Sequence, residues 1–365
     1  MKIIDIDLHL LRVPLRQPFR TALRTVEAIE DIVVRIHTDT GHTGHGAAPA
    51  TAVITGDTHG SIVAAIRHVI APRLVGQDIA GLNHVCALVQ GALAHNTGAK
   101  AAVEIALYDL WGQLHGAPLY RLLGGGTPVV SSDITISVDH PQAMVAEALA
   151  ALERGFGALK VKVGGGNGLD IERVKAVHAA VAGRATLRLD ANQAWTPKQA
   201  VATMRALEAA GIVPELLEQP VQAADIEGLK YVTDRVHAPV MADESVFGPA
   251  QALDLLQRRA ADIINIKLMK SGGLSGALRI ADLAALHGVE CMIGCMIESA
   301  IPVAAAVHLA AARPGTITRV DLDGPALGRF NPVQGGVVFD DPRIMASDAP
   351  GLGITGVHGL QPLAG

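Results

Sequence analysis

Aromatic residues, cysteines and charged residues are all scarce in this 365-residue chain. Aromatic residues make up 3% of it, and charged residues make up 18%, against about 25% in an average domain. Half of the chain is hydrophobic, so Ala, Val, Leu and Ile must build the interior, and a disordered chain is excluded. The three cysteines, Cys86, Cys291 and Cys295, are too few and too irregularly spaced for a disulfide framework.

Basic stripes and long apolar runs are also missing. The net charge of -5 argues against a nucleic-acid partner. The most apolar long stretch, Cys291 to Ala312, is interrupted by Glu298 and Pro302, so it lacks the roughly 18 apolar residues of a membrane span. Asp5 and Asp7 make the first residues unlike a signal peptide. We therefore expect a soluble cytoplasmic protein without a membrane partner, and a homo-oligomer remains open.

The first third of the chain has strands first and helices afterwards. Ile3 to Arg12 alternates loosely, and Asp31 to Thr38 is a β-branched run, so both are predicted strands. The segment from Pro14 to Arg24 between them is predicted to be a loop. Ala99 to Leu114 has the pattern of an Ala-rich amphipathic helix. This order is typical of an α+β unit, which we assign to residues 1–125, because the three glycines 124–126 mark a candidate boundary there.

Short β-branched runs alternate with helical segments in residues 126–324. Eight such runs are predicted strands: 133–138, 158–163, 186–189, 215–217, 239–242, 263–266, 289–293 and 316–320. Alternation of this kind predicts an α/β fold of parallel strands, and eight units are the count of a (β/α)8 barrel, as in a TIM barrel. A doubly wound open sheet is the alternative, but no G-x-G-x-x-G opens a helix. The Gly- and Pro-rich tail, residues 325–365, is expected to pack back on residues 1–125 and complete a capping domain.

Polar residues recur at the ends of these predicted strands. They are 24 to 28 residues apart, which is the length of one repeating βα unit: Thr135, Lys162, Asp190, Glu218, Asp243, Lys267, Cys295 and Asp321. Barrel enzymes keep their chemistry at the carboxyl ends of the strands. The period therefore predicts one site at that end of the barrel.

Three of these residues are carboxylates on successive strands, namely Asp190, Glu218 and Asp243. Adjacent strands lie about 4.8 Å apart, so three unpaired carboxylates would repel one another and raise one another's pKa. A hard divalent cation would remove this conflict, and Mg²⁺ prefers oxygen ligands. No His is present in the set, which disfavours zinc. The alternative is that each acid forms a local salt bridge.

Lysines flank the three acids. Lys160 and Lys162 alternate with apolar residues, so both are expected to point into the barrel, where each would lower the other's pKa. Lys267 closes the sixth strand, opposite the second in an eight-stranded barrel. A substrate between them could meet a base on either face. Exposed lysines on an edge strand are the alternative for Lys160 and Lys162.

Two glycine-rich segments could instead contact an anion. They are 164–168 and the segment from Lys267 to Gly273. Neither matches the phosphate-binding pattern G-x-x-x-x-G-K-[ST]. We interpret both as turns between a strand and a helix.

The motifs KVKVG, LDANQAW, LEQP, ADES and NIKLMKSGG together resemble the enolase superfamily, in its muconate-lactonizing subgroup, over essentially the whole chain. The resemblance implies an α+β capping domain over a modified barrel. It also implies one Mg²⁺ per subunit and a pair of acid/base lysines. The residues it assigns are Asp190, Glu218 and Asp243 to the metal, Lys162 and Lys267 to proton transfer, and Lys160 to assisting Lys162.

Several reactions occur in this subgroup, and the residues after the last strand discriminate among them. Asp321-Leu322-Asp323 carries two acids on one side, which would suit an ammonium group, and this D-x-D resembles the dipeptide epimerases, as does the first strand with Thr135. The resemblance thus implies an isomerase acting on a dipeptide, by two-base 1,1-proton transfer through a metal-stabilised enolate. N-acylamino-acid racemase, o-succinylbenzoate synthase and a non-catalytic barrel that binds an amino acid or peptide remain alternatives. A capped turn is the alternative for the D-x-D.

Specificity in this family comes partly from loops of the cap. Phe19, Thr21 and Arg24 lie in the first of them, and Met296 and Ile297 follow the seventh strand. Arg24 could pair with an acidic side chain of the substrate, as in Ala-Glu epimerases, or it could be structural. The aliphatic residues would suit an apolar side chain. All five are therefore candidate substrate-binding residues.

Overall fold

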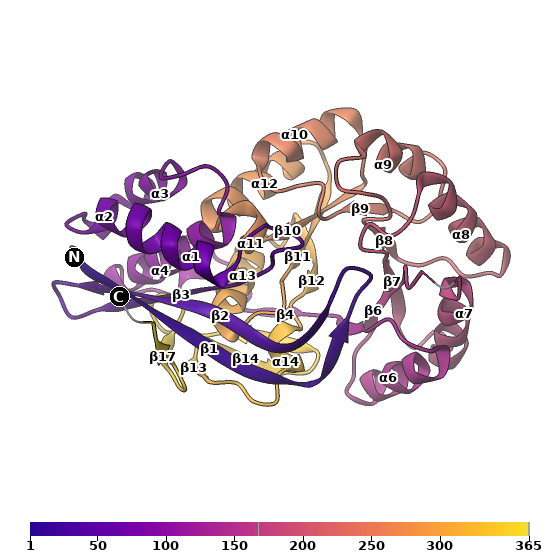
Figure 1. Ribbon diagram of the computed structural model, residues 1–365, viewed down its shortest axis with the longest axis horizontal. Coiled ribbons are helices and arrows are strands. Elements are labelled where there is room, and N and C mark those ends of the chain that lie inside the picture. The colour runs from indigo at the N-terminus through magenta and orange to yellow at the C-terminus, as the bar shows by residue number, and fades with distance from the viewer. Residues whose placement is uncertain (167, 364–365) are drawn as a thin grey trace.

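The computed structural model describes residues 1–166 and 168–363, in which a barrel lies beside a cap of strands and helices (Figure 1). Asn167 of the glycine-rich segment 164–168, and residues 364–365 of the tail, lie outside the described residues. No helix within the described ranges has the length and apolar character needed to cross a membrane.

An antiparallel sheet and a layer of helices form the cap. The sheet order is β17-β1-β2-β3, with bounds β1 (Ile3–Arg20), β2 (Thr25–Thr38), β3 (Thr43–Pro49) and β17 (Gln361–Pro362). The helices are α1 (His59–Ala65), α2 (Ala71–Leu74), α3 (Leu82–Gln90), α4 (Thr97–Leu114) and α5 (Leu119–Leu122), with a π-helical turn at Ile66–Ile70 and a 3₁₀ turn at Ile79–Gly81. A Cβ on Gly46 of β3 would lie 1.8 Å from the Ala102 carbonyl oxygen, so α4 packs this closely on β3 only because that residue is glycine.

Strand β1 is longer than the sequence predicts. The loop expected from Pro14 to Arg24 is wrong for residues 14–20, which continue the strand, and only residues 21–24 form the turn. The register with β2 shifts between Pro14 and Phe19. In this interval the chain bonds elsewhere, since Arg329 N donates to Pro14 O at 2.9 Å and Leu15 bridges to Gly328. The prolines are tolerated because no ladder with β2 is needed at the shift.

Eight parallel strands follow one another in sequence order around the barrel, as expected from the alternating pattern. Their bounds are β5 (Ile134–Ile136), β6 (Ala158–Lys162), β7 (Thr186–Asp190), β8 (Leu216–Glu218), β9 (Val240–Ala242), β10 (Ile263–Lys267), β11 (Glu290–Gly294) and β12 (Ile317–Asp321). The helices between them are α6 (Pro141–Glu153), α7 (Asp170–Val181), α8 (Pro197–Ala209), α9 (Ile226–Thr233), α10 (Pro249–Arg258), α11 (Leu268–Ser271), α12 (Leu274–Leu286) and α13 (Ala300–Ala312). The predicted (β/α)8-type fold is confirmed.

The barrel nearly closes between its two edge strands, β5 and β12. Asp133 N donates to Val320 O at 3.1 Å, and Leu322 N donates to Ser132 Oγ at 2.9 Å. An ion pair of 2.7 Å between Arg188 Nη1 on β7 and Asp133 Oδ2 crosses the interior near this seam. The first and last strands are therefore held together by loop and side-chain contacts.

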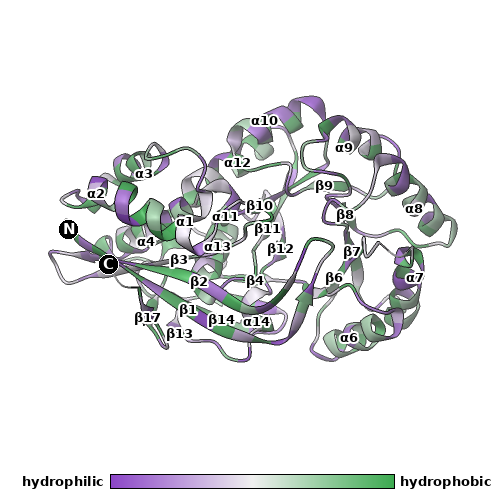
Figure 2. Cartoon of the chain, in the orientation of Figure 1, coloured by the Kyte–Doolittle hydropathy of each residue, from purple (hydrophilic) through white to green (hydrophobic). Residues whose placement is uncertain are grey.

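Helix α13 and the tail join the cap to the barrel. Every residue of α13 is buried, whereas outer helices such as α10 show both hydrophilic and hydrophobic residues (Figure 2). The tail contains α14 (Gly324–Leu327), β13 (Val333–Gly335), β14 (Val337–Asp340), β15 (Arg343–Ala346) and β16 (Ile354–Val357), and β15 pairs with β4 (Val129–Ser131). Leu352 N donates to Asp109 Oδ1 of α4 at 2.8 Å, and β17 pairs with β1.

Candidate active site

Polar side chains meet at the carboxyl ends of the barrel strands. Lys162, Asp190 and Glu218 are the last residues of β6, β7 and β8, and the parallel register places them side by side as strand partners. Lys267 and Asp321 likewise end β10 and β12. Asp243 and Cys295 follow β9 and β11 directly, and Thr135 lies within β5. The period along the sequence thus becomes one ring of side chains at one end of the barrel.

The buried ammonium group of Lys160 lies among three carboxylates. Its Nζ is 3.1 Å from Asp190 Oδ2, 2.7 Å from Glu218 Oε2 and 2.7 Å from Asp321 Oδ2. Burial lowers the pKa of Lys160, but the carboxylates outweigh burial and raise it well above its usual value. The expectation that the pKa of Lys160 would be lowered is therefore wrong. The positive charge of Lys162 was expected to lower the pKa of Lys160, but the three acids around Lys160 have the larger effect.

Lys162 and Lys267 enter the site from opposite sides of the barrel. Lys162 Nζ donates to Asp190 Oδ2 at 2.5 Å, and Lys267 Nζ donates to Asp243 Oδ2 at 2.7 Å. Burial opposes the charge on Lys267, yet Asp243 outweighs it and raises the pKa of Lys267. Each lysine is therefore held in place by an acid from the neighbouring strand region.

Asp190 and Asp243 stay ionised although both are buried. Burial raises the pKa of Asp190, but Lys162 and Lys160 outweigh it and lower the pKa below its usual value. Burial also raises the pKa of Asp243, but Lys267 and Lys270 outweigh it and lower that pKa below its usual value. Glu218 differs, because burial and the charge of Asp190 raise its pKa to about 7.

The three strand-end carboxylates offer the right donor atoms for a hard cation. Within residues 1–166 and 168–363 no three His, Cys, Asp or Glu side chains are arranged closely enough to hold a metal ion, because the three acids each turn towards a lysine. Their chemistry nevertheless fits Mg²⁺, which prefers carboxylate oxygens. Glu218 Oε2 is buried and makes no aligned hydrogen bond to any described residue, although Lys160 lies at ion-pair distance. Asp190, Glu218 and Asp243 are thus the residues that could hold the cation.

Asp321 and Asp323 lie at the end of β12, beside β5. Asp321 Oδ2 accepts a hydrogen bond from Lys160 Nζ at 2.7 Å, and Asp323 Oδ2 accepts one from Thr135 N at 2.7 Å. Burial and the neighbouring Asp321 raise the pKa of Asp323 to about 6. A cationic group brought between these two acids would relieve their repulsion.

One cavity of about 50 Å³ unites the sequence-predicted residues. It is lined by every residue predicted to be catalytic or substrate-binding, that is Phe19, Thr21, Arg24, Thr135, Lys160, Lys162, Lys267, Met296, Ile297, Asp321 and Asp323. The three acids assigned to the metal do not line it, but each forms an ion pair with a lysine that does. Their roles stay predictions, but their positions form one site.

The tip of the β1–β2 hairpin covers this cavity. The Lys162 ammonium lies 5.9 Å from the centre of the Phe19 ring, within range of a cation–π contact. Arg24 is half-buried, and burial lowers its pKa. Among the described residues, no carboxylate lies within ion-pair distance of its guanidinium group. Arg24 is thus a half-buried cation that lines the cavity without a carboxylate partner among the described residues.

Four further polar residues support the site and were not predicted from the sequence. Lys270 Nζ donates to Asp243 Oδ1 at 2.5 Å, and Asn265 Nδ2 donates to Glu218 Oε1 at 2.9 Å. Asn192 Nδ2 donates to Glu244 Oε1 at 3.4 Å. The sequence did contain a signal for these four residues, because each lies within three positions of a residue that ends or follows a barrel strand. Asn265, for example, precedes Lys267 by two and so shares its face of β10.

Comparisons with known proteins agree with this arrangement. Residues 4–124 match the model described as mandelate racemase / muconate lactonizing enzyme, N-terminal domain, and residues 143–357 match the model described as enolase C-terminal domain-like. An L-Ala-D/L-Glu epimerase of Clostridium acetobutylicum is 49% identical over 358 residues, covering 98% of this chain and 100% of that protein.

Solved structures of dipeptide epimerases also resemble this chain over nearly its whole length. The substrate-liganded L-Ala-D/L-Glu epimerase of Bacillus subtilis superposes with a TM-score of 0.96 at 48% identity, covering 98% of this chain and 99% of that one. The dipeptide epimerase of Enterococcus faecalis, solved with Mg and L-Leu-L-Tyr, has a TM-score of 0.94 at 42% identity, covering 98% and 100%.

Proposed function

This chain belongs to the mandelate racemase / muconate lactonizing enzyme family of the enolase superfamily, and we propose that it is an isomerase that epimerises dipeptides. Three relatives that are 44–49% identical to it over nearly their whole length are epimerases of dipeptides. Dipeptide epimerisation requires a base on each face of one α-carbon, a site for the free N-terminus and stabilisation of negative charge. The cavity offers residues suited to each of these needs.

One observation carries the proposal: Lys162 and Lys267, from opposite strands, line the same cavity as Asp321 and Asp323. Epimerisation removes the α-proton of the second residue on one face and returns a proton on the other. One lysine in its neutral form accepts the proton, and the other lysine, as an ammonium, donates one. After one turnover the first lysine holds an extra proton and the second has lost one, and proton exchange with water restores the starting forms. The two lysines exchange roles in the reverse reaction.

Asp190, Glu218 and Asp243 would hold one Mg²⁺. When bound, the cation supplies positive charge that stabilises negative charge developing on the substrate carboxylate. Lys160 lies among Asp190, Glu218 and Asp321. We assign Lys160 to the same stabilisation from the protein side.

Asp321 and Asp323 would bind the N-terminal ammonium group of the dipeptide. Hydrogen bonds between charged partners are about twice as strong as neutral ones. Asp323 is fixed by the backbone N–H of Thr135, so it is held ready for a cation. N-acylamino acids and o-succinylbenzoate precursors lack this ammonium, so they offer Asp321 and Asp323 no cation to bind.

The second residue of the substrate would be acidic. Arg24 faces the cavity without a carboxylate partner in the described part of the chain, and a side-chain carboxylate would supply one. Arginine binds carboxylates through two parallel hydrogen bonds, which fixes their orientation. L-Ala-L-Glu is therefore the first substrate to test.

The test is a dipeptide library incubated with the protein and Mg²⁺ in D₂O and read by mass spectrometry. We expect deuterium to enter the second residue of dipeptides with an acidic C-terminal residue, together with formation of the second diastereomer. Incorporation into N-acetylated dipeptides in preference to free ones would contradict the proposal. Protein with Lys162→Ala and Lys267→Ala combined is the control for background exchange.

A further inference from the structure

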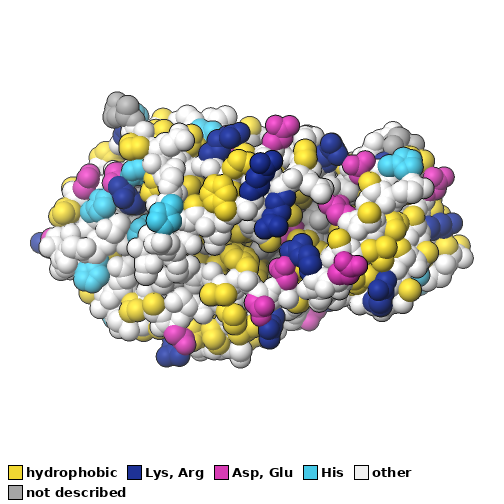
Figure 3. All heavy atoms as spheres, turned by 90° about the horizontal axis from the view of Figure 1, so that it is seen from below, with side chains coloured by type: hydrophobic (Ala, Val, Ile, Leu, Met, Phe, Trp, Pro, Cys, Tyr) yellow, Lys and Arg dark blue, Asp and Glu magenta, His cyan; other side chains and the backbone are white. Residues whose placement is uncertain are grey.

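Glu104 of the cap helix α4 is a buried carboxylate that contacts the barrel and does not line the cavity of the site. Near the middle of the face seen in Figure 3, charged side chains of both signs lie together, and water screens them there. Glu104, in contrast, is 0% exposed. Burial raises the pKa of Glu104, and hydrogen bonds from Ser275 and Gln90 oppose that shift. Since hydrogen bonds must replace the lost solvation of a buried carboxylate, these bonds show what Glu104 holds.

Glu104 and its neighbour Gln90 bind the turn that joins α11 to α12. Glu104 Oε2 accepts a hydrogen bond from Ser275 N at 3.0 Å, and Glu104 Oε1 accepts one from Ser275 Oγ at 2.5 Å. Gln90 Nε2 donates to Glu104 Oε1 at 2.8 Å and to Gly272 O at 2.7 Å. Gly273, the residue before α12, has no side chain with which to cap that helix. A carboxylate from the cap therefore binds the free N–H groups at the start of a barrel helix.

The turn packs against Glu104 without spare room. Gly272 has φ of +73° and Gly273 has φ of +117°, and both values favour glycine. A Cβ on Gly273 would lie 2.5 Å from Glu104 Oε2. The carboxylate thus lies directly against the backbone of the turn and fixes its position relative to α4.

Helix α11 connects this turn to Lys267. Lys267 directly precedes α11, which is four residues long. Ser271 Oγ lies within hydrogen-bond distance of Lys267 O at 3.2 Å and of Gly273 O at 2.9 Å. Gly273 N donates to Leu268 O at 3.0 Å, and residues 267–273 are all buried. A packed segment this short transmits a shift of the turn to the backbone of Lys267.

Lys162 is held by different contacts. Val163, the next residue, donates its backbone N–H to Asp190 O at 2.9 Å. The Lys162 ammonium donates to Asp190 Oδ2 at 2.5 Å. Both contacts join β6 to β7 within the barrel, so a change at Glu104 should move Lys267 and leave Lys162 in place.

We propose that Glu104 is a positioning residue, which fixes Lys267 from the cap and thereby sets the rate of proton transfer on one face of the α-carbon. The inference rests on the proposed function, because it needs two lysines that act on opposite faces. It gives the cap a part in proton transfer in addition to covering the cavity.

The test measures total deuterium uptake in D₂O, counted in substrate and epimer together, from L-Ala-L-Glu and from L-Ala-D-Glu with Mg²⁺ present. The diastereomer that Lys267→Ala still exchanges meets Lys162, and the one that Lys162→Ala still exchanges meets Lys267. Glu104→Gln keeps the size of the side chain but replaces one acceptor oxygen by an NH₂ group, so at least one hydrogen bond to the turn is lost.

We expect Glu104→Gln to lower uptake from the Lys267 diastereomer at least about tenfold, since a misplaced catalytic group costs up to roughly 100-fold in rate. Epimerisation should fall by a similar factor in both directions, because each direction needs both lysines. Uptake from the Lys162 diastereomer should stay within about twofold of the wild-type value.

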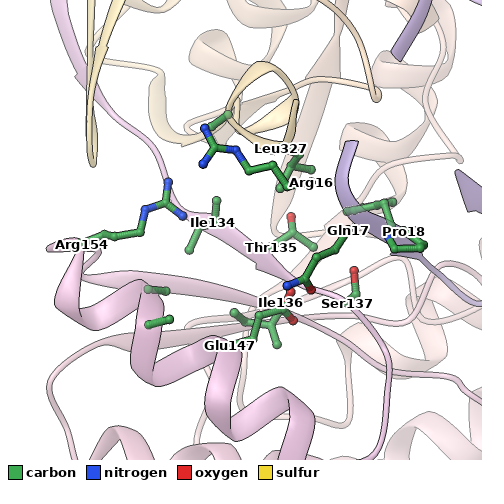
Figure 4. Close-up of a pocket in the computed structure, with 14 residues that line it drawn as sticks. Arg16, Gln17, Pro18, Ile134, Thr135, Ile136, Ser137, Glu147, Arg154 and Leu327 are labelled. Atoms are coloured by element: carbon green, nitrogen blue, oxygen red, sulfur yellow. The ribbon is translucent and has the colours of Figure 1, made fainter. Parts of the chain in front are cut away.

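Two controls separate this effect from a general loss of stability. Asp109 is also a buried carboxylate of α4, but it accepts hydrogen bonds from His45 N at 2.9 Å and Leu352 N at 2.8 Å, away from the turn. Glu147 lies on the barrel helix α6 and lines a pocket beside β5 (Figure 4). Asp109→Asn and Glu147→Gln should leave the ratio of uptake from the two diastereomers as in the wild type.

Gln90→Leu is a second variant at a half-buried position, and it decides the question if Glu104→Gln does not fold. It removes the hydrogen bonds to Glu104 and Gly272, so the ratio should shift in the same direction. Equal losses from both diastereomers, as expected if the turn acted through Lys270 on Asp243, would overturn the proposal and leave dipeptide epimerisation intact. An unchanged ratio would do the same. Failure of the wild type to exchange or epimerise any dipeptide would overturn the proposed function together with this inference.

Discussion

Replacing Arg24 should remove the preference for an acidic second residue. The turn that carries Arg24 is fixed by two hydrogen bonds with Thr21, because Thr21 N donates to Arg24 O at 3.0 Å and Arg24 N donates to the Thr21 side-chain Oγ1 at 3.3 Å. The guanidinium is half-buried and faces the cavity. A hydrogen bond to a charged group in such a position contributes about 1.5–3 kcal/mol.

That energy corresponds to a selectivity of roughly 10- to 150-fold, at 1.4 kcal/mol per factor of ten. We therefore expect wild-type protein to use L-Ala-L-Glu at least tenfold better than L-Ala-L-Gln, which has the same shape without the charge. Arg24→Met should reduce this ratio to below about threefold, mainly by lowering the kcat/KM for the Glu substrate. The assay is the initial rate of epimer formation, followed by chiral chromatography.

Arg12→Met is the matched control for this experiment. Arg12 lies on β1, is exposed, and pairs with Glu30 at 2.8 Å away from the cavity, so its replacement should leave the Glu to Gln ratio unchanged. A ratio that survives in Arg24→Met would refute the reasoning. Arg24 would then have a structural role, and the acidic side chain would be recognised elsewhere.

Three further predictions test other parts of the account. Exhaustive chelation with EDTA should abolish α-proton exchange and Mg²⁺ should restore it; full activity after chelation would exclude a metal at Asp190, Glu218 and Asp243. A dipeptide with a free N-terminus should be turned over at least tenfold better than its N-acetylated form, and Asp323→Asn should narrow that difference; an unchanged preference would remove Asp323 from ammonium binding. Arg188→Leu should lower the free energy of unfolding by about 3–5 kcal/mol in urea titrations, because it leaves the buried Asp133 unpaired. The exposed ion pair of Arg12 with Glu30 should contribute at most about 1 kcal/mol to the free energy of unfolding in the same assay. Equal losses on replacing Arg12 and Arg188 would contradict the expectation that the buried pair contributes more.

The barrel was predictable because its repeating unit leaves a period in the sequence. Asp190, Glu218 and Lys267 each end a strand, as the spacing indicates. An apolar strand followed by a helix must bring such residues to one end of a parallel sheet. This physical constraint acts on every unit in the same way, so the ring of polar residues follows from the period of the sequence.

The partners of these side chains were not predictable from spacing. The raised pKa of Lys160 depends on distances to acids on β7, β8 and β12, and only the closed barrel sets those distances. The prediction of a loop is wrong for residues 14–20 for a related reason. It contains two prolines and bonds to the tail about 310 residues later, a contact that no local pattern encodes. The lack of a described carboxylate within ion-pair distance of Arg24 likewise depends on the tertiary fold, so the sequence pattern could not predict it.

The assignment of one base to each face of the α-carbon is tested most directly by exchange in D₂O with single lysine variants. Lys162→Ala and Lys267→Ala are each incubated with L-Ala-L-Glu and with L-Ala-D-Glu in the presence of Mg²⁺, and the deuterium in the Glu residue is measured before any epimer accumulates. We predict that each variant exchanges the α-proton of one diastereomer only, that the two variants exchange opposite diastereomers, and that neither epimerises. Exchange of both diastereomers by either variant, or normal epimerisation by Lys267→Ala, would contradict the two-base assignment.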